Sequence, residues 1–212
     1  MNSLLIRRAK MTPHYYNTIE KPSMAEFKDR GSRFIAFAFP IINVNEFKEI
    51  LDSVKKQHPK ATHHCFAYRL GTEQNKYRAS DDGEPSGTAG RPILSQIDSN
   101  QLTDIVIIVA RYFGGTLLGT GGLINAYKTA ASFALEAAIV IRKPVCTRYR
   151  LDFDYTFMND VMLIGKQFDC VIVQREMGLY CSLMMDIPMS SIDEVLVKLG
   201  NLKRIEVEKV QQ

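Results

Sequence analysis

Five glycines lie close together in residues 111–128, where the sequence reads RYFGGTLLGTGGLINAYK. The β-branched run at residues 105–110 predicts a buried strand before them, and apolar residues at helical spacing predict a helix after them. A glycine loop between a strand and a helix presents free backbone N–H groups at the positive end of the helix dipole. The segment is therefore predicted to hold an anion such as a phosphate through Gly114, Gly115, Gly119, Gly121 and Gly122.

The glycine-rich segment differs from the common phosphate-binding motifs. No Gly-Lys-Ser/Thr closes it, so it is not a Walker A loop, and the Gly-x-Gly-x-x-Gly spacing is also missing. The alternative is that the glycines only let the helix pack tightly on the sheet, which is common between a strand and a helix.

A second segment, residues 80–92, reads SDDGEPSGTAGRP and combines three acids, three glycines and two prolines. This composition predicts a loop, and a loop so dense in special residues favours function. Asp81, Asp82 and Glu84 are expected to order it, although aspartates also cap N–H groups in ordinary turns. Thr88, Gly90 and Arg91 precede a predicted helix and suggest a second anion site.

Basic and aromatic residues stand near both segments, including Arg78, Arg91, Arg111, Tyr112 and Lys128. Arginine beside aromatic rings suits phosphate contacts and base stacking. Residues 144–212 hold 8 of the 27 Lys and Arg and 10 of the 23 Asp and Glu, which leaves 19 and 13 for residues 1–143. The basic excess therefore belongs to the part with the glycines, although such a surplus is also typical of solvated surface.

His63, His64 and Cys65 are the remaining residues with catalytic chemistry. Adjacent side chains on a strand point to opposite faces, so only His63 and Cys65 share one. They allow a thiol nucleophile with a histidine base, whereas the simpler interpretation is a core cysteine between half-exposed histidines. No metal-binding spacing is present, and neither a catalytic residue, a metal ligand nor a cofactor is predicted.

Composition narrows the class of protein. The 212 residues are 46% hydrophobic, which is enough for one large or two small domains. No apolar run approaches the roughly 20 residues of a membrane span, and the N-terminus does not have the pattern of a signal peptide. The four cysteines are scattered, as in reduced proteins. We therefore expect a cytoplasmic location and no membrane partner.

The hydrophobic pattern predicts two α+β domains, residues 1–143 and 144–212. In the first, residues 1–30 are expected to be an irregular lead-in with an edge strand at most. Strands at 33–39, 63–70, 76–79 and 105–110, helices at 43–57 and around 93–97, and a helix ending near Val140 follow. After a linker at 142–144, strands near 145–155, 170–176, 179–187 and 204–209 and two helices give the βαββαβ order of a ferredoxin-like domain.

Three stretches together resemble the YigZ/IMPACT family: HHCFAYRLG at residues 63–71, RASDDGEPSGTAGRPIL at 78–94 and IVARYFGGTLLGTGGLINAYKTAA at 108–131. The likeness is dense over residues 31–140. Members usually carry His-Asn-Cys where this chain has His63-His64-Cys65. The resemblance implies a first domain like the second domain of a small-subunit ribosomal protein and domain IV of elongation factor G. It implies a second domain like domain V of that factor.

The eukaryotic members of this family regulate translation under amino-acid starvation, through regions that this chain lacks. The bacterial members resemble RNA- or ribosome-associated proteins. Our lead hypothesis is a non-enzymatic, translation-associated protein that binds RNA, the ribosome or another phosphate-bearing partner, with a translation-related protein as a further possible partner. Its predicted binding residues are Arg78, Asp81, Asp82, Glu84, Ser86, Thr88, Arg91, Arg111, Tyr112, Gly114, Gly115, Gly119, Gly121, Gly122 and Lys128. It predicts that Arg111→Ala weakens binding and leaves the fold intact.

Two alternatives remain open. One is an enzyme that acts on a phosphorylated small molecule, with Mg²⁺ held by Asp81, Asp82 and Glu84. The other is a protein-interaction module of the translation stress response, in which the glycine motifs serve only the fold. A large apolar or aromatic surface away from the glycines would favour the second.

Overall fold

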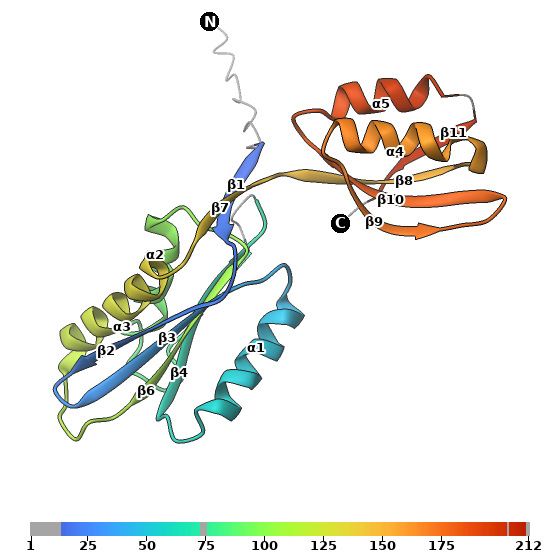
Figure 1. Ribbon diagram of the computed structural model, residues 1–212. Helices are drawn as coiled ribbons and strands as arrows, with labels where there is room; N and C mark the ends of the chain where they lie inside the picture. The colour runs from blue at the N-terminus through green and yellow to red at the C-terminus, as the bar shows by residue number, and fades with distance from the viewer. Residues whose placement is uncertain (1–13, 73–75, 203, 211–212) are drawn as a thin grey trace, which may run out of the picture. The chain divides into compact units, whose positions relative to one another are not determined.

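The computed structural model describes residues 14–72, 76–202 and 204–210 (Figure 1). The chain divides into two compact units, one comprising Tyr16–Lys143 and one containing the residues from Pro144 onward. Each unit has its own main sheet and its own hydrophobic core.

The larger unit contains three helices and seven strands within its described residues. In chain order these are β1 Tyr15–Ile19, β2 Ser23–Asp29, β3 Ser32–Pro40, α1 Val44–Gln57, β4 His63–Leu70, β5 Lys76–Ser80, α2 Gly90–Ser99, β6 Ile105–Tyr112, α3 Gly119–Glu136 and β7 Val140–Pro144. The main sheet has the order β2-β3-β6-β4-β5, with every neighbouring pair antiparallel. Strands β1 and β7 form a separate two-stranded sheet.

Helices cover both faces of the main sheet, α1 on one side and α2 with α3 on the other (Figure 1). The central strand β6 shows why, because its residues 105–110 are all apolar and alternate between the faces. Ile105, Ile107 and Val109 pack toward α2 and α3, whereas Val106 and Ile108 pack toward α1. The next residue on the α3 side of β6 is Arg111.

The smaller unit has the predicted ferredoxin-like arrangement. Its elements are β8 Cys146–Asp154, a short 3-10 helix Tyr155–Phe157, α4 Met158–Gln167, β9 Val171–Glu176, β10 Tyr180–Pro188, α5 Ile192–Gly200 and β11 Ile205–Lys209. The sheet order is β11-β8-β10-β9, and all neighbours are antiparallel. Leu151, Leu183 and Val195 lie in one core that the sheet shares with α4 and α5. The predicted α+β class is confirmed.

Three expectations about the larger unit need correction. The lead-in contains two strands: β2 is the edge strand that was expected, and β1 was not expected. Helix α3 ends at Glu136 and not near Val140. The expected linker at 142–144 is part of β7, because the β-branched residues that precede it pair with β1, more than 100 residues earlier in the chain. Such long-range pairing leaves no local periodicity to detect.

Within the described part of the chain, no helix combines the length and the apolar character that crossing a membrane requires.

Candidate anion-binding pocket

Arg111 lies at the end of β6 and faces α3. Its neighbours across the sheet are Phe34 on β3 and His63 on β4. The residue is only 5% exposed. Its guanidinium carbon lies 5.4 Å from the centre of the Phe34 ring and 5.7 Å from that of Phe113. A permanently charged group is thus held in a largely apolar setting, which is costly unless a partner offsets the charge.

Glu84 is that partner. Arg111 Nη1 donates a hydrogen bond to Glu84 Oε1 at 2.5 Å, and the Glu84 side chain is 3% exposed. The hydroxyl of Tyr127, on α3, donates to the same oxygen at 2.6 Å. Burial raises the pKa of Tyr127, so the hydroxyl keeps the proton that it donates. The loop of residues 80–92 is therefore fastened to both β6 and α3 through one carboxylate.

Most of the hydrogen-bonding capacity of Arg111 is unused. A guanidinium has five N–H donors, and the described residues accept only from Nη1. Nε is fully buried and has no partner. A buried donor without an acceptor costs about 1–3 kcal/mol. Nε and Nη2 together form the edge with which a guanidinium binds an oxyanion in a bidentate manner, and Arg111 lines a pocket.

A pocket of about 390 Å³ opens beside Arg111. Apolar side chains and the start of α3 make most of its wall, and polar groups lie mainly on the sheet side. Its lining residues are Thr62, His63, Glu84, Pro85, Arg111, Phe113, Leu117, Leu118, Gly119, Thr120 and Leu123. A small number of polar groups in an apolar wall is the usual composition of a ligand site.

The N-terminus of α3 contributes to this pocket through Gly119 and Thr120. The residue before the helix is Leu118, which has no side chain able to cap it, and the structure shows no side-chain cap there. The first four N–H groups of a helix have no partner within the helix. The 18-residue helix α3 therefore directs unsatisfied donors and a positive dipole end at the pocket.

By contrast, the N-terminus of α2 is already capped by a carboxylate of the protein itself. Asp81 accepts hydrogen bonds from the N–H groups of Gly87 at 2.8 Å, Ala89 at 3.0 Å and Gly90 at 2.8 Å. Burial by itself would raise the pKa of this carboxyl, but the three backbone hydrogen bonds outweigh it and the pKa is lowered. The second anion site expected around Thr88, Gly90 and Arg91 is wrong, because the chain's own carboxylate occupies that helix end.

We expect Asp81→Asn to destabilise the larger unit by about 2 kcal/mol at pH 7, because an amide is a weaker acceptor than a carboxylate at a helix end. The pKa of Asp81 is depressed in the folded state. Its stabilisation is therefore complete above the unfolded-state pKa of about 4 and is lost as the pH falls through the lower folded-state pKa. Urea unfolding of both proteins at pH 7 and pH 3 should show a smaller difference at pH 3. An equal difference at both pH values would contradict this account.

The loop carboxylates do not form the magnesium site of the enzyme alternative. Asp82 Oδ2 accepts from the backbone N–H of His64 on β4 at 2.7 Å, whereas Asp81 accepts from N–H groups at the start of α2 and Glu84 accepts from Arg111 on β6. Mg²⁺ requires several oxygens around one point. Over the residues that the structure describes, no three His, Cys, Asp or Glu side chains are placed to hold a metal ion together.

His63 and His64 have different environments, as their alternation on β4 predicts. His63 Nδ1 lies 2.8 Å from the carbonyl oxygen of Asp82, so in the neutral ring Nδ1 carries the hydrogen and Nε2 is an acceptor. Nε2 lies 3.9 Å from Glu84 Oε1 at the pocket wall. His64 faces the α1 side, where burial lowers its pKa and Nε2 lies 3.1 Å from the carbonyl oxygen of His58.

Cys65 is a core residue. It is fully buried, and its Sγ lies 3.0 Å from the carbonyl oxygen of Asp81 and 3.3 Å from the hydroxyl of Tyr127. Burial raises the pKa of the thiol, so it stays protonated. A nucleophile must be a thiolate within reach of substrate, and the hypothesis of a Cys65 nucleophile is therefore wrong.

The five glycines have separate roles. A Cβ on Gly114 would lie 1.9 Å from the carbonyl carbon of Gly31, so this glycine permits contact between two backbones. Gly115 and Gly119 have positive φ angles and open space where a Cβ would stand. Gly121 and Gly122 lie within the first turn of α3. Of the five, Gly119 lines the pocket.

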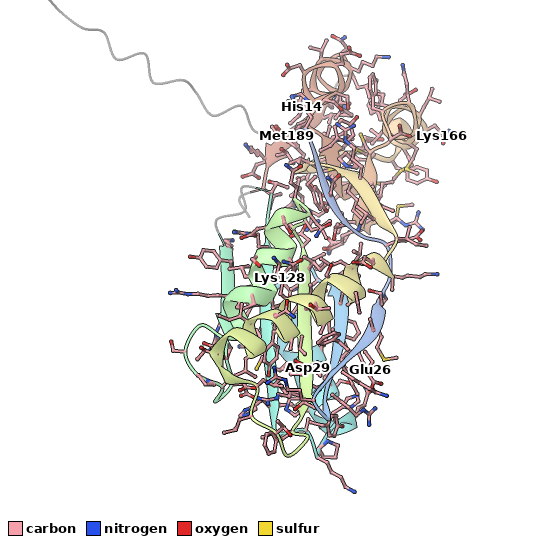
Figure 2. The ribbon with its side chains drawn as sticks, turned by 90° about the vertical axis from the view of Figure 1, so that its left-hand side faces the viewer. His14, Glu26, Asp29, Lys128, Lys166 and Met189 are labelled. Carbon is pink, nitrogen blue, oxygen red and sulfur yellow. The ribbon has the colours of Figure 1, made fainter. Side chains whose placement is uncertain are left out.

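The predicted basic residues do not gather at one site. Arg78 lies over the ring of Phe66, and Tyr112 contacts His58 through its hydroxyl, both on the α1 side of the sheet. Arg91 on α2 and Lys128 on α3 are exposed, and Figure 2 shows Lys128 on its helix. In the remaining loop positions, Ser86 is exposed and the Thr88 hydroxyl donates to the carbonyl of Pro85.

The pocket thus unites Glu84, Arg111 and Gly119 from the predicted set and adds residues that the sequence analysis did not assign. The additions are Thr62, His63, Pro85, Phe113, Leu117, Leu118, Thr120 and Leu123. One signal could have indicated them: Phe113 and Leu117 are large apolar residues in a glycine loop, and both are substantially exposed. Exposed apolar residues grouped in a loop often mark a binding site.

Comparison with known proteins identifies the family. A family model described as the Impact N-terminal domain matches residues 30–135. The Escherichia coli K12 protein "IMPACT family member YigZ" is 35% identical over 177 residues, which cover 82% of this chain and 87% of that protein. The chain belongs to the IMPACT family. The resemblance found in its sequence is confirmed, and the matched domain contains every residue of the pocket.

Two further proteins are similar to most of this chain. "IMPACT family member YvyE" of Bacillus subtilis 168 is 38% identical over 148 residues, which cover 70% of this chain and 68% of that protein. A solved structure described as "Crystal structure of an hypothetical protein" has 30% sequence identity and a TM-score of 0.75. It covers 94% of this chain and 99% of its own, so the two proteins share both units.

Proposed function

We propose that this IMPACT family protein is a non-enzymatic, translation-associated protein that binds RNA or the ribosome through the pocket beside Arg111. The association with translation is supported by membership of the IMPACT family, whose eukaryotic members are regulators of translation. The observation that carries the proposal is the buried guanidinium of Arg111, whose Nε has no partner among the described residues, at a pocket that also receives the uncapped start of α3. A phosphate would satisfy donors from both.

The surrounding groups favour binding over catalysis. Asp81 and Asp82 accept from backbone N–H groups, and Glu84 accepts from Arg111 and Tyr127. These bonds hold the loop in place and leave each carboxylate committed to the fold. A preorganised donor set of this kind binds an anion without the cost of ordering the site at the same time.

A second candidate, the protein-interaction module, is favoured by one observation on the smaller unit. The hairpin between β9 and β10 carries Met177, Leu179 and Tyr180 at its tip, and Leu179 is 89% exposed and Tyr180 81% exposed. Tyr155 is also exposed, and its backbone N–H donates to the carbonyl of Leu179 at 3.4 Å. Grouped exposed apolar side chains are typical of a protein contact.

The lead proposal predicts that Thr120→Glu weakens RNA and ribosome binding about tenfold, because a like charge then stands beside the bound phosphate. Thr120 is exposed in the first turn of α3, where a glutamate stabilises the helix by about 0.5 kcal/mol. Lost binding therefore cannot result from unfolding. Labelled RNA and purified ribosomes titrated across a salt series give the affinity and its salt slope.

Thr120→Gln is the matched control, since it has the same size and no charge, and its affinity should stay near that of the natural protein. Equal binding by the glutamate and glutamine variants would contradict a site at the start of α3. If, in addition, Leu179→Ser abolished ribosome association, the protein-interaction module would replace the lead proposal.

A further inference from the structure

We infer that the pocket beside Arg111 recognises a terminal phosphate monoester on a nucleoside-sized body, as found at the 5′ end of an RNA or in a free nucleoside monophosphate. This inference rests on the proposed function and narrows it. It distinguishes an end of a chain, or a single nucleotide, from the phosphodiester backbone along a strand. Three features of the pocket carry it: the depth of its cation, the placement of its donors and its apolar wall.

The cation is too deep for a continuous strand. Arg111 is only 5% exposed where it lines the pocket. A phosphodiester has a sugar on each side, and both would have to enter the pocket for the phosphate to meet this edge of the guanidinium. A phosphate monoester has a substituent on one side alone and can enter with its free oxygens leading. The buried position of the donor therefore selects a terminal group.

The donors stand on two walls of the pocket. Arg111 contributes from β6, on the sheet side, and the first-turn N–H groups beginning at Gly119 contribute from α3. A planar carboxylate directs its two oxygens within one plane and suits one such wall. A phosphate monoester has three free oxygens that point in different directions, so it can accept from the guanidinium edge and from the helix at once.

The remaining wall suits the body that carries the phosphate. Phe113, Leu117, Leu118, Leu123 and Pro85 line it, and Phe113 and Leu117 are 49% and 82% exposed. Apolar and aromatic surface of this kind packs against a nucleobase or ribose, and a base stacked on an aromatic ring contributes about 1–3 kcal/mol. A volume of about 390 Å³ lies within the usual range for small-ligand sites.

Glu84 affects how the binding of a terminal phosphate should depend on salt concentration. Its carboxylate offsets the charge of Arg111 at 2.5 Å, so the pocket selects a phosphate by donor geometry and by the dipole of α3 more than by net charge. Contacts along an RNA backbone release counterions and weaken steeply as salt rises. The preference for a terminal phosphate should instead change little between low and moderate salt.

The test compares two oligoribonucleotides of one sequence, one with a 5′ phosphate and one with a 5′ hydroxyl, in fluorescence-anisotropy titrations at several salt concentrations. We expect the phosphorylated RNA to bind about tenfold more tightly, a ratio equivalent to about 1.4 kcal/mol. The ratio should persist as salt rises. The corresponding nucleoside monophosphate is then added as a competitor: displacement of the phosphorylated RNA shows that a free nucleotide suffices, and its absence shows that the RNA end is required.

Two variants locate the preference. Arg111→Lys keeps the charge beside Glu84 and removes the guanidinium edge, so the two RNAs should bind within about twofold of each other. Leu117→Ser changes an 82% exposed residue of the apolar wall and should weaken the phosphorylated RNA selectively. If Arg111→Lys does not fold, Leu117→Ser still tests the inference. Ile124→Ser is the matched control, because Ile124 is an exposed apolar residue of α3 outside the pocket lining.

Failure of this inference is distinguishable from failure of the proposed function. Equal affinity for the two RNAs, with a steep salt slope, would overturn the terminal-phosphate inference and leave RNA binding in place. Binding of the nucleoside monophosphate without binding of either RNA or of ribosomes would overturn the proposed function and support the pocket's specificity. No binding of any of these ligands would overturn both.

Discussion

Replacing Arg111 with alanine is expected to destabilise the larger unit by about 3–5 kcal/mol, because it leaves the buried carboxylate of Glu84 without its cation. The Glu84 side chain is 3% exposed, and among the described residues the Tyr127 hydroxyl would be left as its hydrogen-bond donor. Removal of one partner of a buried ion pair costs more than the pair contributes, since the other charge remains in an apolar environment. Urea unfolding followed by circular dichroism measures the loss.

A second variant separates charge from packing. In Arg111→Met with Glu84→Gln, both charges are gone and Tyr127 can still donate to the amide oxygen, so we expect much of the stability to return. Arg91→Ala is the surface control: Arg91 is exposed, and its loss should change the free energy of unfolding by less than about 0.5 kcal/mol. An Arg111→Ala protein with the natural urea midpoint would show that the ion pair does not stabilise the fold.

This prediction revises the sequence-based expectation that Arg111→Ala weakens binding and leaves the fold intact. Arg111 has two roles in the structure, as the cation paired with Glu84 and as the donor that faces the pocket. A loss of RNA binding in the alanine variant would combine both effects. Thr120→Glu separates them, because it opposes an anion at the pocket and stabilises α3.

Sequence periodicity was sufficient for the fold wherever a segment has a strong apolar or alternating pattern of its own. The βαββαβ order of the smaller unit follows from alternating helical and strand patterns separated by turn residues. The apolar run at residues 105–110 of β6 similarly predicts a buried strand, and in the structure helices cover both of its faces. The β1–β7 pair was missed because its partners are separated by most of the larger unit, and no short-range pattern reports such a pairing.

The candidate site was predicted in part for a related reason. Residue types alone indicated Arg111, Glu84 and the glycines, because charged residues beside a cluster of glycines are typical of an anion-binding site. Their hydrogen-bond partners are set by the tertiary structure. The sequence alone does not show that Asp81 caps α2 or that Glu84 pairs with Arg111, which is 27 residues away. Residues of one type, such as Arg78 and Arg111, were grouped by chemistry and lie on opposite faces of the sheet.

The second large effect is expected from Gly114→Ala, which should destabilise the larger unit by more than about 3 kcal/mol or prevent its folding. A Cβ at this position would lie 1.9 Å from the carbonyl carbon of Gly31 and 2.2 Å from the backbone nitrogen of Ser32. These are backbone atoms of the β2–β3 turn and cannot rotate away as a side chain can. The turn and the loop after β6 would have to separate, at the cost of the hydrogen bond from Gly114 N–H to Ser32 Oγ.

Gly121→Ala is the matched control for Gly114→Ala, because it makes the same chemical change in the same glycine-rich segment. Gly121 lies in α3, and an added Cβ meets no atom within 4 Å. Alanine restricts the unfolded chain and favours the helix, so this variant should be more stable by about 0.5–1 kcal/mol. Thermal unfolding of both variants would then give shifts of opposite sign. Equal destabilisation by the two would show that the glycines act through a shared feature of the loop and not through the backbone contact at Gly31.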